Sequence, residues 1–133
     1  MAKEILIHVL FIFSFNFSFS QNQHAKSKNY CSEIISQVSK NWKLDSLGYT
    51  KFRKSYVRKF LHSKIDSVSN TYLLQNLGNP NKTWKADGKI EYVYYYFSGN
   101  LSSGHIYTEY LIFSFDARNL LLLSIRQSDN DPS

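Results

Sequence analysis

Few side chains of this sequence are of the kinds that perform catalysis or bind a metal. The chain of 133 residues has one cysteine, Cys31, and the three histidines outside the N-terminal apolar run, His24, His62 and His105, are isolated from one another. His105 and Glu109 are four residues apart, but a metal site needs more ligands than these two. Cys31 has no base beside it, and the chain has neither a Gly-x-Ser-x-Gly elbow nor a glycine-rich phosphate loop. The sequence therefore predicts a protein without catalytic residues, cofactor or metal.

The densest group of charges is basic and recurs at helical spacing. The candidate basic surface consists of Lys51, Lys54, Arg58 and Lys59. Such a surface could hold an anionic membrane or an acidic protein partner, and it could equally be the solvated face of a helix. Nucleic acid is not an expected partner, because the chain is predicted to be exported.

Aromatic residues form a second candidate site. If Leu111 and Phe113 face the protein interior, the opposite face of the same sheet carries an apolar set. This candidate partner face consists of Tyr94, Tyr96, Tyr110, Ile112 and Leu122. If this set is exposed, it is suited to binding a protein partner. If the N-terminal helix covers it, these residues belong to the core instead.

The N-terminus has the layout of a secretory signal. Lys3 precedes an almost wholly apolar run at residues 5–19, and small residues lead up to Ser20, after which cleavage is expected. The run is shorter than the roughly 20 residues of a membrane-spanning helix, although an uncleaved anchor is the alternative. The formal net charge of +6 is unchanged by cleavage, because Lys3 and Glu4 cancel. We expect a signal peptide at 1–20, a flexible lead-in at 21–30, one domain at 31–127 and a tail at 128–133.

Three helices are expected ahead of the strands. Apolar residues recur at helical spacing over residues 32–42, 51–62 and 63–77. Ser63 and Asp66 resemble a capping box at the start of the third helix. Gly78 predicts its end, because glycine accepts a left-handed conformation, and Pro80 prevents its continuation.

From Gly78 onward the pattern changes to strands. Residues 90–98, 106–115 and 120–127 predict three strands, with a turn at 86–89 before the first. Short connections favour an antiparallel meander. The fold class is therefore α+β, with N-terminal helices packed on one face of a three-stranded antiparallel meander as a two-layer sandwich.

The register of the last strand has two solutions. Leu111, Phe113 and Phe115 are expected to face the helices. A loop of three or five residues then puts Leu121, Leu123 and Ile125 on the same face, whereas a loop of four puts Leu120, Leu122 and Ser124 there.

The segment Leu77-Gly78-Asn79-Pro80, followed by a strand with Tyr92 and Tyr94 and by Phe115-Asp116 before a short apolar strand, resembles the SmpA/OmlA family of small outer-membrane lipoproteins. The resemblance covers residues 63–126 and implies the BamE-like fold and a role in envelope assembly. The family's lipid-bearing cysteine has no counterpart here, so a lipid anchor is not expected. A second pattern, Trp42-x-x-Asp45-x-x-Gly48 with Arg53, resembles small uncharacterised exported bacterial proteins.

Together these features predict an exported, periplasmic or secreted, non-enzymatic module that binds a protein partner in the cell envelope. The alternative is a peripheral protein held on anionic membrane surfaces by its basic helix.

Overall fold

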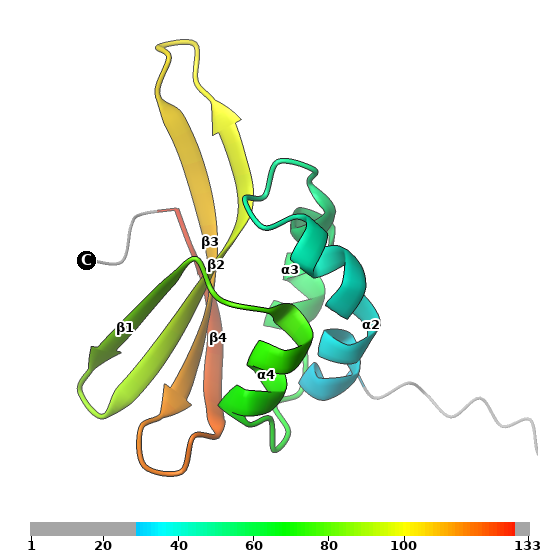
Figure 1. The fold of residues 1–133 in the computed structure, drawn as a ribbon, viewed down its shortest axis with the longest axis vertical. Coiled ribbons are helices and arrows are strands. Elements are labelled where there is room, and N and C mark those ends of the chain that lie inside the picture. Colours follow the sequence, from blue (N-terminus) through cyan, green and yellow to red (C-terminus); the bar gives the residue numbers. More distant parts are fainter. Residues whose placement is uncertain (1–28, 130–133) are drawn as a thin grey trace, which may run out of the picture.

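The computed structural model describes residues 29–129, which form a layer of helices packed on one face of a sheet (Figure 1). The elements in chain order are α2 Cys31–Leu44, α3 Phe52–Leu61, α4 Asn70–Leu77, β1 Lys82–Ala86, β2 Lys89–Asn100, β3 Ile106–Asp116 and β4 Leu122–Ser128. The predicted α+β class is confirmed. The predicted signal peptide, the lead-in up to residue 28 and residues 130–133 of the predicted tail lie outside the described residues. Within residues 29–129 no helix is long and apolar enough to cross a membrane.

The sheet has four strands, so the prediction of three was wrong. The strands lie in the order β1-β2-β3-β4, and each pairs antiparallel with its neighbour. The additional strand, β1, is almost wholly exposed and includes Lys82, Trp84 and Lys85, so it lacks the apolar alternation of a strand. The predicted turn does join β1 to β2, with Asp87 and Gly88 both at positive φ, as two-residue hairpins require.

The third helix is shorter than predicted. α4 begins only after Ser69, whose side chain accepts a hydrogen bond from the backbone N–H of Tyr72. The predicted capping residue Asp66 instead caps α2, where it accepts hydrogen bonds from the backbone N–H and the hydroxyl of Ser32. Lys64 and Asp66 thus serve the start of another helix, and local spacing along the chain could not reveal that.

The predicted end of the third helix is confirmed. Gly78 follows α4 with a φ of 78°, and its N–H donates to the carbonyl of Leu74 at 2.9 Å. The carbonyl of Gly78 accepts a hydrogen bond from the hydroxyl of Tyr94 at 2.8 Å. The helix stop is therefore also a contact between α4 and β2.

The core lies between the helices and one face of the sheet. Leu111, Phe113 and Phe115 face the helices as predicted, and all three are fully buried. Trp42 of α2 packs edge-on against Phe60 and Tyr94, with ring centroids 5.3 and 6.0 Å apart. One aromatic cluster therefore joins α2, α3 and the central strands.

Neither predicted register of the last strand is correct throughout. Leu122 pairs with Phe115 and Ile125 pairs with Phe113, and both belong to the core on the helix side. The register shifts between Ser114 and Phe115, which leaves Leu123 46% exposed. A β-bulge thus moves the strand from one alternation to the other, because an extra residue reverses the side-chain direction.

Gly48, in the loop between α2 and α3, touches the sheet backbone. Its φ is 75°, and its carbonyl accepts a hydrogen bond from the N–H of Ser98 at 3.3 Å. A Cβ atom at this position would lie 2.7 Å from the backbone nitrogen of Phe97, so any side chain would force the loop off β2.

We expect Gly48→Ala to lower the free energy of unfolding by about 2–4 kcal/mol, the sum of left-handed strain and overpacking. Gly88→Ala is the matched control, because Gly88 has a φ of 72° and open space around it. Gly88→Ala should lower the free energy of unfolding only by the left-handed strain, about 1–2 kcal/mol. Urea denaturation of both variants measures the difference, and equal losses would show that the close approach of Gly48 to β2 is unimportant.

Candidate functional site

The candidate partner face does not exist as one surface. Tyr94, Tyr96 and Leu122 lie on the helix-facing side of the sheet and are buried there. Tyr110 and Ile112 lie on the opposite side and are also buried. The prediction failed because Tyr94 pairs with Leu111, and paired residues share a face.

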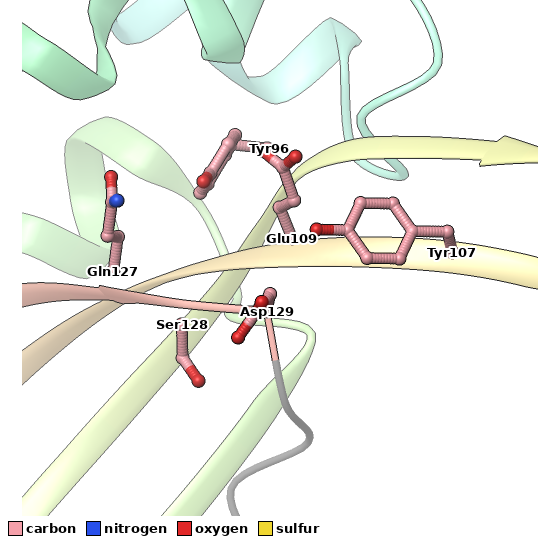
Figure 2. A pocket seen from close by; sticks show the side chains of 6 residues that line it. All are labelled: Tyr96, Tyr107, Glu109, Gln127, Ser128 and Asp129. Atoms are coloured by element: carbon pink, nitrogen blue, oxygen red, sulfur yellow. The ribbon is translucent and has the colours of Figure 1, made fainter.

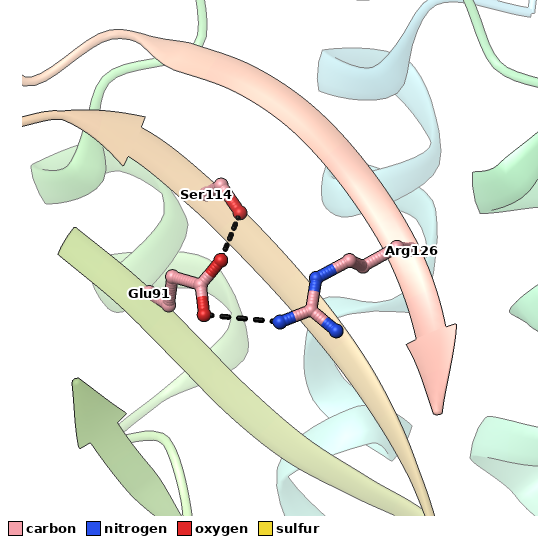
Figure 3. Close-up of polar contacts among 3 residues, drawn as sticks. All are labelled: Glu91, Ser114 and Arg126. Atoms are coloured by element: carbon pink, nitrogen blue, oxygen red, sulfur yellow. Dashed lines mark hydrogen bonds and ion pairs between the residues drawn. The ribbon is translucent and has the colours of Figure 1, made fainter. Parts of the chain in front are cut away.

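The sheet face opposite the helices combines a small apolar cluster with a polar network. Val93 and Ile112 are buried there beside Tyr95 and Tyr110, whose rings meet edge-on at 5.3 Å. Next to them, Glu91 of β2 joins the two strands beyond it (Figure 3). Its carboxylate accepts hydrogen bonds from the Ser114 hydroxyl at 2.8 Å and from Arg126 at 3.1 Å. This face is therefore not the exposed aromatic surface that the sequence suggested.

The four residues of the candidate basic surface make different contacts and do not form one continuous surface. Lys51 is the N-cap of α3, and the ammonium of Lys59 lies over the ring of Tyr56 at 4.8 Å. The ammonium of Lys54 lies 3.9 Å from the ring centroid of Phe97. Only Lys54 and Arg58 of the four line a groove between α3 and the sheet.

Arg53, within the same helix, is buried and holds α3 in place. Its Nε donates to the carbonyl of Trp42 at 3.0 Å, and its Nη1 donates to the carbonyl of Tyr95 at 2.8 Å. The guanidinium also lies 4.9 Å from the ring centroid of Trp42. Burial lowers the pKa of Arg53 to about 10, with Asp45 acting in the opposite direction, so the side chain stays charged at neutral pH.

Asp45 completes this arrangement at the turn between α2 and α3. It is buried, and its carboxylate accepts hydrogen bonds from the backbone N–H groups of Thr50 at 2.9 Å and Arg53 at 3.1 Å. The resemblance-based pattern of Trp42, Asp45, Gly48 and Arg53 therefore describes one structural unit, which positions α3 beside β2.

The groove that α3 forms with the sheet is the best candidate for a binding site. Its wider part, about 390 Å³, is lined by Lys54, Val57, Arg58, Leu61, Tyr96, Glu109 and Gln127. A hollow of about 260 Å³ shares Tyr96, Glu109 and Gln127 and adds Tyr107, Ser128 and Asp129 (Figure 2). One end of the groove is therefore basic and the other end is acidic.

Two phenols and two carboxylates define the acidic end. Figure 2 shows the hydroxyl of Tyr107 directed toward Glu109. Burial, and then Glu109, raises the pKa of Tyr96 well above its usual range. Partial desolvation, and then Glu109 and Asp129, raises the pKa of Tyr107. Both phenols are therefore protonated hydrogen-bond donors at neutral pH, beside groups that carry negative charge.

Tyr107, Gln127 and Asp129 were not predicted as site residues from the sequence. Glu109 was singled out only for its spacing from His105. Tyr107 and Glu109 alternate with Leu111 along β3, so they share the helix-facing side, and this spacing was the available signal. The bulge in β2 between Tyr95 and Phe97, which brings Glu109 opposite Phe97, could not be deduced in this way.

The remaining candidate chemistry is dispersed. His62 ends α3 and His105 lies in the β2–β3 loop, and both are exposed. His24 lies outside the described residues. Among residues 29–129 no group of three or more His, Cys, Asp or Glu side chains could hold a metal ion.

The thiol of Cys31 is buried at the start of α2. Burial, and then the nearby charge of Asp66, raises its pKa to about 12. The thiolate is the reactive form, so this environment suppresses reactions of the thiol.

We expect the folded protein to react with Ellman's reagent at pH 8 at least about 100-fold more slowly than the denatured chain, whose thiol has a pKa near 8.5. Absorbance at the wavelength of the released thiolate follows the reaction. Comparable rates in the two states would contradict the burial of Cys31.

We expect Arg53→Lys to lower the free energy of unfolding by about 2–4 kcal/mol, because an ammonium cannot reproduce the planar set of donors at these carbonyls. Arg58→Lys, a conservative change at an exposed position of the same helix, should stay within about 0.5 kcal/mol of the original protein. Equal losses of stability in the two variants, measured by thermal or urea denaturation, would contradict the structural role of Arg53.

The chain matches no protein-family model, no curated protein and no solved structure. The resemblance to the SmpA/OmlA family therefore stays a prediction.

Proposed function

We propose that this chain is an exported, non-enzymatic protein-binding module of the cell envelope. The observation that supports the proposal is a group of exposed apolar side chains at one end of the molecule. Leu47 and Tyr49, in the loop between α2 and α3, are 49% and 60% exposed. Leu101 and Ile106, in the β2–β3 hairpin, are 51% and 65% exposed. Large exposed apolar side chains in two neighbouring connections are a feature of interaction surfaces.

The hairpin presents part of this group well away from the core. Figure 1 shows its end extending beyond the helical layer. Its base is held to the loop by the hydrogen bond from the N–H of Ser98 to the carbonyl of Gly48. The loop and the hairpin are thus positioned together, and a partner could contact both.

The chemistry of the groove supports binding more than catalysis. Its phenols Tyr96 and Tyr107 have raised pKa values, so they are poor nucleophiles at neutral pH. Outside the groove, the thiol of Cys31 is buried and has a raised pKa. Hydrogen-bond donors beside fixed carboxylates are suited to recognising a partner.

A second candidate function has its own supporting observation. Lys51 and Lys54 lie close in sequence to the exposed ring of Tyr49, and Lys54 lies over Phe97 at the base of the hairpin. Apolar and cationic side chains at one end also suit an anionic membrane surface.

Site-specific photo-crosslinking distinguishes these functions. A photoreactive residue in place of Ile106 should give a discrete protein adduct in envelope extracts, and Leu101→Ser should remove it. The same residue in place of Thr71, exposed on α4 and remote from the hairpin in sequence, is the control. No adduct at position 106, or the same adducts at both positions, would contradict the proposal.

Vesicle flotation tests the second function in the same preparation. Binding to vesicles of phosphatidylglycerol that is lost at high salt, and lost in Lys51→Glu and Lys54→Glu, would favour the membrane surface. Salt-independent binding, or none, would exclude it.

A further inference from the structure

The β2–β3 hairpin has one edge that pairs with no strand of the described residues. β2 and β3 stay paired as far as Asn100↔Ile106, whereas the pairing of β3 with β4 ends at Tyr110↔Ser128. The chain bends at Asp129. Within residues 29–129, the segment 106–109 of β3 therefore has a strand on one side only.

Among residues 29–129, this edge of β3, called here the free edge, has few of the features that normally prevent strand addition. Proteins protect such edges with lysines, prolines, bulges or a covering segment. Ile106, Tyr107 and Thr108 are residues of high β-propensity, and Glu109 is the single charge of this segment. The other edge of the hairpin differs, because the loop at Gly48 accepts a hydrogen bond from Ser98 of β2.

The acidic hollow lies directly beneath this edge. Tyr107 and Glu109 contribute to it from β3, and Ser128 and Asp129 contribute from the end of β4 (Figure 2). A strand added along β3 would continue the line of β4 about 4.8 Å from β3, and alternate side chains would point into the hollow.

The charges of the hollow specify the occupant. Glu109 and Asp129 both line it, and the phenols of Tyr96 and Tyr107 are uncharged at neutral pH. The cations Lys54 and Arg58 line the adjoining part of the groove with Glu109, whereas among the described residues the hollow itself has no basic residue in its lining. A lysine or arginine entering from an added strand would meet two carboxylates and form charge-assisted hydrogen bonds. A second copy of this chain, added edge to edge, would place its own Glu109 near this one and is disfavoured by like charge.

We infer that the free edge of β3 at residues 106–109 binds an extended segment of a partner protein by strand addition, with a basic side chain of that segment held by Glu109 and Asp129. Main-chain hydrogen bonds supply the general affinity of such contacts, and the pocket for an alternate side chain supplies the specificity. The inference rests on the proposed protein-binding function and names the kind of segment that is bound.

The test uses the full chain and a fluorescein-labelled probe, the peptide acetyl-Thr-Val-Thr-Arg-Thr-Val-Thr-amide. Fluorescence anisotropy should show saturable binding of this probe. The analogue with Glu in place of Arg should bind at least about tenfold more weakly, and so should the analogue with Pro in place of both Val, which cannot form a continuous strand.

The protein variants locate the contact. Glu109→Gln should weaken binding of the arginine probe by about fivefold or more, the effect of losing one charge-assisted bond. Glu33→Gln is the matched control, because Glu33 is an exposed acid on α2. It should leave the affinity unchanged. Circular dichroism of both variants establishes that the fold is intact.

Several outcomes would overturn the inference. These are no binding of the arginine probe, equal binding of the proline analogue, equal or stronger binding of the glutamate analogue, or equal effects of Glu109→Gln and Glu33→Gln. Dimerisation of the free chain in sedimentation velocity, abolished by the probe, would identify a second copy as the occupant and also overturn it. If the peptides fail while crosslinking at position 106 persists, the inference falls and the proposed function stands.

Discussion

The buried guanidinium of Arg53 is the interaction on which the rest of the structure depends. It connects three segments, because its hydrogen bonds reach the end of α2 at Trp42, the following turn at Ser46 and the middle of β2 at Tyr95. Burying a charge is costly unless its donors are satisfied, and here backbone carbonyls and an aromatic face satisfy them. The network therefore places α3 against the sheet in one position.

This position determines what the surface can offer. Because Arg53 and Val57 face inward, Lys54 and Arg58 reach the groove from the same helix. The close approach of Gly48 to β2 fixes the loop against the base of the hairpin. The groove and the free edge of β3 therefore share Glu109, and the exposed loop lies at the β2 edge of the same hairpin. A buried structural network thus sets the geometry of the proposed interaction surface.

The unequal lengths of the strands produce the remaining feature. β2 and β3 pair over their whole length, whereas β1 and β4 pair with only part of them. The part of β2 and β3 that extends beyond β1 and β4 projects as a two-stranded hairpin. Its β3 edge adjoins the hollow of Glu109 and Asp129. Sheet stability resides in the four-stranded region over the helices, so the projecting part can carry exposed residues without loss of the core.

The sequence by itself determined the α+β class, the inward set Leu111, Phe113 and Phe115, the helix end at Gly78 and the turn into β2. Each follows from local periodicity or from the backbone freedom of single residues. Only the tertiary structure decided the location of the tyrosines, the partner of Asp66, the existence of β1 and the register of β4. These depend on strand pairing, on bulges at Tyr96 and Leu123, and on contacts between segments 34 or more residues apart, such as Ser32 with Asp66. Local patterns specify which face of an element is apolar, but the pairing of distant backbones decides what that face meets.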